Sequence, residues 1–183
     1  MKSQPSITFE ESDTLISIVG LGSNQDSRNG SKFEIICKAI HSLEELSSRP
    51  SIISSFYESE PEFCPPDSPI FVNLVAVLFL PLNAEPMRFF RCVQKLEKRL
   101  GRVRSGEIND PRPIDIDLLF FGKKSISSDY LTIPHPRAVK RRFVLEPLAE
   151  IAPDLILPGQ EFSVVELLSR LPNNGWVRKF QPT

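Results

Sequence analysis

The order of apolar segments along the chain limits its fold more than any other feature of the sequence. Four runs have strand-like composition, at residues 15–21, 52–57, 70–80 and 114–121. Two segments between them carry apolar residues at helical spacing, one near residues 28–47 and one from Asn83, expected as the N-cap, to Gly101. The order strand, helix, strand, strand, helix, strand predicts an α+β fold: a ferredoxin-like βαββαβ antiparallel sheet with helices packed on it and a C-terminal extension.

The extension follows the fourth strand. We expect residues 123–171 to add a short strand, a helical turn around residues 139–148 and a helix that opens with the capping box Ser163-x-x-Glu166. The chain therefore divides into a flexible N-terminal tail, a single domain and a C-terminal tail, at residues 1–13, 14–171 and 172–183.

Charge and cysteine content exclude several classes of protein. The chain has 22 Lys and Arg residues against 23 Asp and Glu, so it lacks the basic field that attracts nucleic acids or membrane surfaces. Cys37, Cys64 and Cys92 form no C-x-x-C pair, which argues against a disulfide framework or a zinc site. Residues 1–13 lack the apolar core of a secretory signal, and no apolar run approaches the roughly 20 residues of a membrane-spanning helix. We therefore expect a soluble cytoplasmic protein.

Two acidic residues stand out in the fourth strand. Because side chains alternate along a strand, Asp115 and Asp117 project from one face while Ile114, Ile116 and Leu118 point into the core. Like charges so close raise each other's pKa unless a cation separates them. Paired oxygen ligands suit Mg²⁺, which completes its coordination with water and substrate phosphates. In isolation, the same pattern is more often a solvated strand edge.

Nearby arginines favour the functional interpretation. Arg102, Arg104 and Arg112 lie on the segment that leads to the two acids. Carboxylates for a metal together with guanidinium groups for phosphate oxygens are typical of phosphoryl transfer. The G-x-x-x-x-G-K-[ST] phosphate loop is absent, and the segment 20–25 matches a dinucleotide fingerprint only in part, so it is better explained as a tight turn.

Several segments in the same order resemble the 6-hydroxymethyl-7,8-dihydropterin pyrophosphokinase family. They are Gly22-Ser23-Asn24, Ser55-Phe56-Tyr57-Glu58-Ser59-Glu60-Pro61, Phe71-Val72-Asn73, Glu97 with Gly101-Arg102-Val103-Arg104, Pro111-Arg112-Pro113-Ile114-Asp115-Ile116-Asp117 and Ile133-Pro134-His135-Pro136-Arg137. The similarity runs through about residues 15–168 in one register.

The resemblance implies a ferredoxin-like pyrophosphokinase domain at residues 14–171. Such an enzyme moves the β,γ-pyrophosphoryl group of ATP, its co-substrate, onto the pterin hydroxymethyl oxygen and releases AMP, as a step of folate biosynthesis. Two Mg²⁺ ions are implied as cofactors, and ATP and 6-hydroxymethyl-7,8-dihydropterin as the partners, with no nucleic acid and no membrane. Relatives are sometimes fused to neighbouring folate-pathway enzymes.

The same resemblance assigns roles to individual residues. The metal ligands are Asp115 and Asp117, and the catalytic arginines of a mobile loop are Arg102, Arg104 and Arg112. The ATP-binding residues are Gln94, Glu97, Leu118, Thr132, His135 and Arg141. The pterin-binding residues are Ser59, Glu60, Pro61, Phe71, Asn73 and Phe143, with the pterin ring between the two phenylalanines.

The chain departs from the family pattern at a few positions. Asp110 stands in place of a glycine and Asn109 in place of an aromatic residue, both next to the Pro-Arg motif. Ser59 stands where threonine is common, and Arg142 replaces a small residue. The changes at Asn109 and Asp110 bear on how the loop closes over the nucleotide.

Other functions remain open from the residues alone. A two-metal nucleotidyl transferase or cyclase palm also carries paired acids on a ferredoxin-like sheet, although it usually divides them between two strands. A catalytically silent ferredoxin-like binding module, such as an RNA-recognition domain, shares the element order but needs exposed aromatics on its central strands. Residues 15–21 contain no aromatic residue.

Overall fold

In the computed structural model of the chain, the described residues are 7–9, 13–62, 67–103, 110–172 and 175–181. The elements follow the chain in the order β1 (Leu15–Ser23), α1 (Lys32–Glu44), β2 (Ile52–Ile53), β3 (Phe56–Ser59), β4 (Phe71–Leu80), α2 (Pro86–Arg99), β5 (Asp115–Phe121), β6 (Ile126–Ser127), β7 (Thr132–Ile133), the 3-10 helix η1 (Ala138–Lys140), α3 (Arg142–Ile151), α4 (Val164–Arg170) and β8 (Val177–Phe180).

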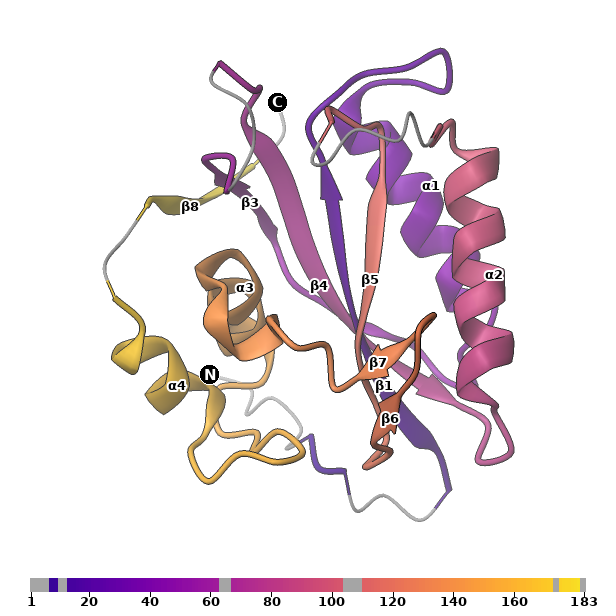
Figure 1. Cartoon of the computed structure of the whole chain (residues 1–183), viewed down its shortest axis with the longest axis vertical. Coiled ribbons are helices and arrows are strands. Elements are labelled where there is room, and N and C mark those ends of the chain that lie inside the picture. The colour runs from indigo at the N-terminus through magenta and orange to yellow at the C-terminus, as the bar shows by residue number, and fades with distance from the viewer. Residues whose placement is uncertain (1–6, 10–12, 63–66, 104–109, 173–174, 182–183) are drawn as a thin grey trace.

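One antiparallel sheet organises the molecule. Its strand order is β5-β1-β4-β3-β8, with β2 also paired to β4, while β6 and β7 form a separate hairpin. β1 pairs antiparallel with β4 on one side and with β5 on the other. Figure 1 shows α1 and α2 together on one face of the sheet, and α3 and α4 on the other. The predicted α+β class, with an antiparallel sheet and helices packed on it, is confirmed.

Helices on both faces explain the burial of the strands. Every residue of β4 except Phe71 is buried, and apart from Asn73 the strand is entirely apolar. The first four residues of β5 alternate between half-buried and buried side chains. Ile116 and Leu118 belong to the core beneath α1 and α2, so Asp115 and Asp117 point to the opposite face. The predicted division of this strand between core and acidic face is confirmed.

The first helix begins later than predicted. Ser31 is its N-cap, because the Ser31 hydroxyl accepts from the Glu34 N–H at 3.4 Å and the Glu34 carboxylate accepts from the Ser31 N–H at 2.8 Å. This capping box places residues 28–30 outside the helix. The helix ends at Glu44, before the expected residue 47.

Asn83 was wrongly predicted as the N-cap of the second helix. α2 begins at Pro86, and its N-cap is Glu85, which makes no side-chain capping bond. Proline is favoured at the first helical position because its fixed φ suits a helix and its missing N–H is not needed there. The other end agrees with the prediction, since Gly101 follows the helix with φ +101.

The run at residues 52–57 forms two short strands. Ile53 pairs with Ala76 and Tyr57 with Asn73, so this side of the ladder holds one extra residue, as in a β-bulge. Ser54 fills the interruption, because its N–H donates to the Val75 carbonyl and its hydroxyl accepts from the Val75 N–H, both at 3.0 Å.

The C-terminal extension contains more structure than predicted. The helical turn expected around residues 139–148 is η1 followed by α3, and the capping box of Ser163 and Glu166 opens α4 as predicted. β8 pairs with β3, and Phe9 lies 6.5 Å from Phe120 between ring centres, so residues from both terminal segments contact the domain. Within the described part of the chain, no helix combines the length and apolar content that crossing a membrane requires.

The core should depend on individual leucines of β4. Leu78 is fully buried, whereas Leu82, just beyond the strand, is 60% exposed. Leu78→Ala should lower the free energy of unfolding by about 2–5 kcal/mol, because it leaves a cavity under α1 and α2. Leu82→Ala is the matched control and should cost less than about 0.5 kcal/mol. Urea denaturation of both variants checks this, and equal losses would contradict the assigned core.

Candidate functional site

Three neighbouring strands form the floor of a polar cavity on the α3 side of the sheet. The strand register places Asp115 of β5 beside Gly22 of β1, and Gly22 beside Asn73 of β4. The cavity has a volume of about 260 Å³. Gly22 keeps this floor open, because a Cβ at that position would lie 3.2 Å from the Asn73 Oδ1 and 3.7 Å from the Phe71 ring.

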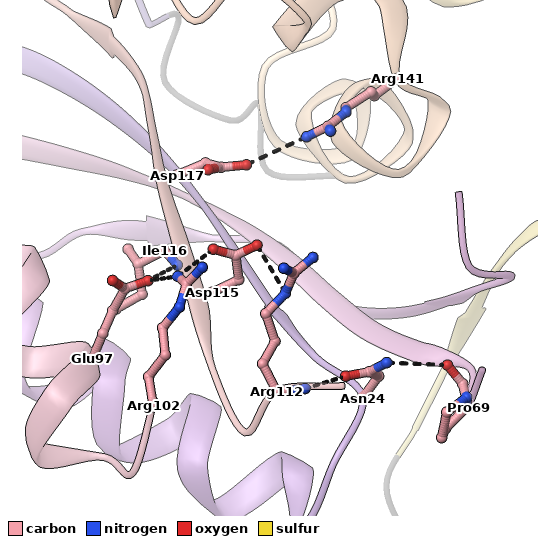
Figure 2. A network of polar contacts seen from close by, with 9 residues as sticks. All are labelled: Asn24, Pro69, Glu97, Arg102, Arg112, Asp115, Ile116, Asp117 and Arg141. Carbon is pink, nitrogen blue, oxygen red and sulfur yellow. Dashed lines mark hydrogen bonds and ion pairs between the residues drawn. The ribbon is translucent and has the colours of Figure 1, made fainter. Parts of the chain in front are cut away.

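Two arginines hold the first carboxylate of β5. Figure 2 shows the Arg102 guanidinium between Asp115 and Glu97, and Arg112 on the other side of Asp115. The Arg112 Nε lies 3.1 Å from the Asp115 Oδ2. The turn after α2 delivers Arg102, since the Arg102 N–H donates to the Glu97 carbonyl at 3.0 Å. These cations offset the charge that Asp115 brings into a partly buried site.

Glu97 is a buried carboxylate that joins α2 to β5. It is 4% exposed, and it accepts hydrogen bonds from the Arg102 guanidinium and from the Ile116 N–H, the latter at 2.8 Å. Burial raises the pKa of Glu97, and the neighbouring Arg102 opposes that rise. Glu97 therefore fixes the position of Arg102 beside Asp115.

The second carboxylate of β5 lies opposite a third arginine. The Arg141 Nη1 lies 3.4 Å from the Asp117 Oδ2, and Figure 2 shows Arg141 approaching from the turn before α3. Burial, followed by the charge of Asp115, raises the pKa of Asp117 to about 6. A further cation beside Asp117 would offset the cost of charging this carboxylate.

Asn24 is a buried residue that links two segments of the site, and no role was predicted for it. Its Oδ1 accepts from the Arg112 N–H at 2.8 Å, and its own N–H donates to the Arg112 carbonyl at 3.2 Å. Its Nδ2 donates to the Pro69 carbonyl at 3.5 Å (Figure 2). The end of β1 thus ties the Arg112 segment to the segment that enters β4 at Phe71.

Five of the residues predicted to bind the pterin line the cavity. Ser59 and Asn73 are both buried, and the Asn73 Nδ2 donates to the Ser59 hydroxyl at 3.0 Å. Phe71 and Phe143 also line the cavity. Glu60 reaches the same cavity and also accepts a hydrogen bond from the Trp176 N–H at 3.1 Å.

Each aromatic ring has a guanidinium group nearby. The Arg112 Cζ lies 5.7 Å from the centre of the Phe71 ring, and the Arg141 Cζ lies 5.1 Å from that of Phe143. Pro61, also predicted to bind the pterin, lines an adjacent hollow of about 350 Å³ instead.

Another hollow, of about 270 Å³, shares Asp117 with the cavity. It contains three of the residues predicted to bind ATP, namely Leu118, Thr132 and His135. Burial, then the charge of Arg141, lowers the pKa of His135 to about 4, so its ring is neutral at pH 7. Its Nδ1 accepts from the Arg137 N–H at 3.2 Å, which leaves the ring proton on Nε2 as a donor.

Gln94 lines neither the cavity nor the hollow that contains His135. It lines two further hollows along α2, one of which also contains Glu97 and Arg102. Arg104 and Asn109 lie outside the described residues. Two charged residues of the cavity had no predicted role: Arg137, and Glu62, whose Oε2 lies 3.9 Å from the Arg141 Nε. Nothing in the local sequence pattern singles out Glu62, because only the turn before α3 brings Arg141 near it.

The donor set fits magnesium. Asp115 and Asp117 offer hard oxygen ligands, and the described part of the chain holds no cluster of three or more His, Cys, Asp or Glu side chains that could form a closed metal site. Two carboxylates leave coordination positions for water and phosphate, as Mg²⁺ prefers. The Nε atoms of Arg112 and Arg141 are buried and lie near carboxylate oxygens of Asp115 and Glu62, but neither makes a well-directed hydrogen bond, so phosphate oxygens would complete both guanidinium groups.

Comparison with known proteins identifies relatives of the whole domain. A sequence profile of the family described as 7,8-dihydro-6-hydroxymethylpterin-pyrophosphokinase (HPPK) matches residues 18–153. The 2-amino-4-hydroxy-6-hydroxymethyldihydropteridine pyrophosphokinase of Haemophilus influenzae is 34% identical over 161 residues, which cover 87% of this chain and 95% of the relative. The enzyme of the same name from Pseudomonas aeruginosa is 38% identical over 158 residues, covering 86% and 92%.

Longer relatives contain the matching region as one part. The folic acid synthesis protein fol1 of Pneumocystis carinii is 36% identical over 153 residues, which cover 84% of this chain. The chain spans only 20% of the length of that fungal protein. A crystal structure of Plasmodium falciparum HPPK-DHPS superimposes with a TM-score of 0.66 at 16% identity, covering 88% of this chain and 42% of that one. This structural match shows a shared fold.

Metal binding should follow the protonation of Asp117. Because the pKa of Asp117 is raised to about 6, this carboxylate is charged at pH 7.5 and mostly protonated at pH 5. The affinity for Mg²⁺ alone should therefore fall about tenfold between these values. Calorimetric titration with MgCl₂ at constant ionic strength checks this. Asp117→Asn should bind weakly at both pH values, and an unchanged affinity of the wild type would contradict the assignment.

Proposed function

Because the chain belongs to the 7,8-dihydro-6-hydroxymethylpterin-pyrophosphokinase family, we propose that it transfers the β,γ-pyrophosphoryl group of ATP to 6-hydroxymethyl-7,8-dihydropterin, giving the pterin diphosphate and AMP in folate biosynthesis. One observation carries this proposal. Asp117 lines both the cavity with the predicted pterin residues and the hollow with the predicted ATP residues. A metal held there would lie where the two substrates meet.

The cavity supports binding of a flat heterocycle. Phe71 and Phe143 provide apolar faces for a pterin ring, and Asn73 and Ser59 provide hydrogen-bonding groups for its edge. Glu60 would contact the ring from the same side. The ring stacks between the phenylalanines with its hydroxymethyl group toward the carboxylates of β5.

The hollow that contains His135 supports binding of ATP. Leu118 offers an apolar contact, while Thr132 and the protonated Nε2 of His135 offer hydrogen bonds to the nucleotide. Gln94 and Glu97 brace the nucleotide from α2. The triphosphate then runs from this hollow past Asp117 into the cavity.

The arginines orient the phosphates for transfer. In the reaction, the hydroxymethyl oxygen bonds to the β-phosphorus and gives up its proton to water, while the bond from that phosphorus to the oxygen retained by AMP breaks. Arg102, Arg112 and Arg141 lie around the carboxylates, and with Arg104 they bind phosphate oxygens and exclude water. Two Mg²⁺ ions held by Asp115 and Asp117 would supply charge neutralisation of the phosphates.

The architecture supports the finer parts of the proposal. We assign the core of β1, α1, β3, β4, α2 and β5 to the ferredoxin-like class, because the order β5-β1-β4-β3 is that of a split βαβ sheet. Residues 14–171 form the pyrophosphokinase domain, which acts in the cytoplasm. Since the matching region is one part of the longer fungal protein, we propose that this chain acts fused to or adjacent to another folate-pathway enzyme.

The alternatives fit the site less well. A nucleotidyl transferase or cyclase palm usually divides its acids between two strands, whereas both acids here lie on β5. A silent binding module of the RNA-recognition type needs an open aromatic face, whereas β1 and β4 are largely covered by helices in the described structure. The released product separates the enzymes, since a pyrophosphokinase forms AMP and a nucleotidyl transferase forms pyrophosphate.

Turnover should depend on both carboxylates of β5. Asp115→Asn and Asp117→Asn should each lower kcat for AMP formation at least about 100-fold, because each removes a charged ligand from the metal and phosphates. AMP release from ATP and the pterin alcohol, followed by chromatography, measures this. Asp154→Asn is the control, since Asp154 is exposed and outside the cavity, and it should keep full activity. Unchanged turnover in either β5 variant would refute the proposal.

The pterin side can be tested separately at Gly22. A methyl group there would meet the Asn73 Oδ1 at 3.2 Å and narrow the cavity. Gly22→Ala should weaken binding of the pterin alcohol about tenfold or more, while the affinity for a non-hydrolysable ATP analogue with Mg²⁺ stays within about twofold. Isothermal calorimetry with each ligand distinguishes the two effects. Equal losses for both ligands would show that Gly22 supports the fold and not the pterin pocket.

A further inference from the structure

Glu150, near the end of α3, connects this helix to two strands through one carboxylate. Its oxygens accept hydrogen bonds from the Ser55 N–H at 2.9 Å and the Ser55 hydroxyl at 2.8 Å. They also accept from the Tyr57 hydroxyl at 3.2 Å and the Lys179 ammonium at 2.7 Å. Ser55 and Tyr57 belong to the β3 side, and Lys179 to β8. None of these four residues lines the cavity.

The charge state of this cluster makes its hydrogen bonds strong. Burial pushes the pKa of Glu150 upward, but hydrogen bonds from Lys179 and Ser55 outweigh it, so the pKa lies below its usual value. Burial, then the charge of Glu150, raises the pKa of Tyr57 to about 12, so the phenol keeps its proton. Hydrogen bonds to an ionised acceptor are stronger than neutral ones. Lys179 is half exposed, so its ion pair alone adds little.

The same helix and strand form two walls of the cavity. Ser59 follows Tyr57 by two residues on β3, so both side chains point to one face, about 7 Å apart. Phe143 precedes Glu150 by seven residues on α3, which places both on one side of the helix, about 10 Å apart. α3 lies over this face of the sheet (Figure 1). Glu150 therefore fixes one end of a helix–strand contact whose other end is the cavity.

We propose that Glu150 is a positioning residue for the pterin: by holding α3 against β3, it sets the separation between Phe143 and the pair of Ser59 and Asn73. The proposal rests on the function proposed above. The hollow assigned to ATP is built from α2, β5 and residues 128–136, none of which contacts Glu150 through a hydrogen bond. The loss of Glu150 should therefore act on one substrate and not on the other.

Steady-state kinetics with both substrates tests this role. Glu150→Ala should raise the KM for the pterin alcohol about tenfold, with kcat and the KM for ATP within about twofold. Glu150→Gln keeps the length and one acceptor oxygen but loses the charge and the second acceptor, so it should recover only part of the loss. Tyr57→Phe should raise the same KM by a smaller factor, and its effect should not add to that of Glu150→Ala, which already removes the acceptor of the Tyr57 hydroxyl.

A control separates positioning from general stability. Glu166→Ala removes the capping box of α4 and should lower Tm without changing either KM. If Glu150→Ala does not fold, Glu150→Gln and Tyr57→Phe carry the test. Equal changes in both KM values, or a lower Tm with unchanged kinetics, would overturn the positioning role alone. A wild-type chain without AMP formation would overturn the proposed function and this inference together.

Discussion

Two carboxylates on one face of β5 impose the arrangement of the surrounding residues. Strand geometry places Asp115 and Asp117 about 7 Å apart on the same side, where burial and mutual repulsion disfavour two negative charges. Guanidinium groups from three separate segments offset these negative charges. Arg102 comes from the turn after α2, Arg112 from the segment before β5 and Arg141 from the turn before α3. The turns around this site are thus constrained by charge as well as by packing.

The same balance suits the site to the charged substrate proposed for it. A buried carboxylate without a cation is costly, so the protein pairs each acid with an arginine. A metal held by Asp115 and Asp117 would take over this neutralisation and leave the guanidinium groups available for phosphate oxygens. Glu97 and Asn24 matter here because they hold Arg102 and Arg112 through contacts independent of the two acids. Arg102 and Arg112 would therefore keep their positions if their ion pairs with Asp115 were broken.

Much of the fold could be predicted because its signals are local. A few adjacent residues suffice to show the alternation of side chains in β5, the largely apolar composition of β4 and the capping box of α4. Errors arose where two local signals competed. Pro86 prevailed over Asn83 at the start of α2, and a bulge at Ser54 divided a run that looked like one strand. The pairing of β8 with β3 joins distant segments, and no short pattern could reveal it.

The candidate site was predictable in its residue types and less so in its contacts. Asp115, Asp117 and the arginines stand out because their chemistry is unusual at that spacing. Glu62 and Glu150 look like ordinary surface acids, and only the folded chain brings Glu62 near Arg141 and Glu150 to the β3 side. Long-range partners of this kind depend on how α3 docks on the sheet, which the sequence around each acid does not encode.

A crystal structure with Mg²⁺, a non-hydrolysable ATP analogue and the pterin alcohol tests the central claim most directly. The account predicts Mg²⁺ at about 2.0–2.1 Å from carboxylate oxygens of Asp115 and Asp117, with the triphosphate between the two hollows. Both acids facing bulk solvent, with no metal or phosphate beside them, would contradict it.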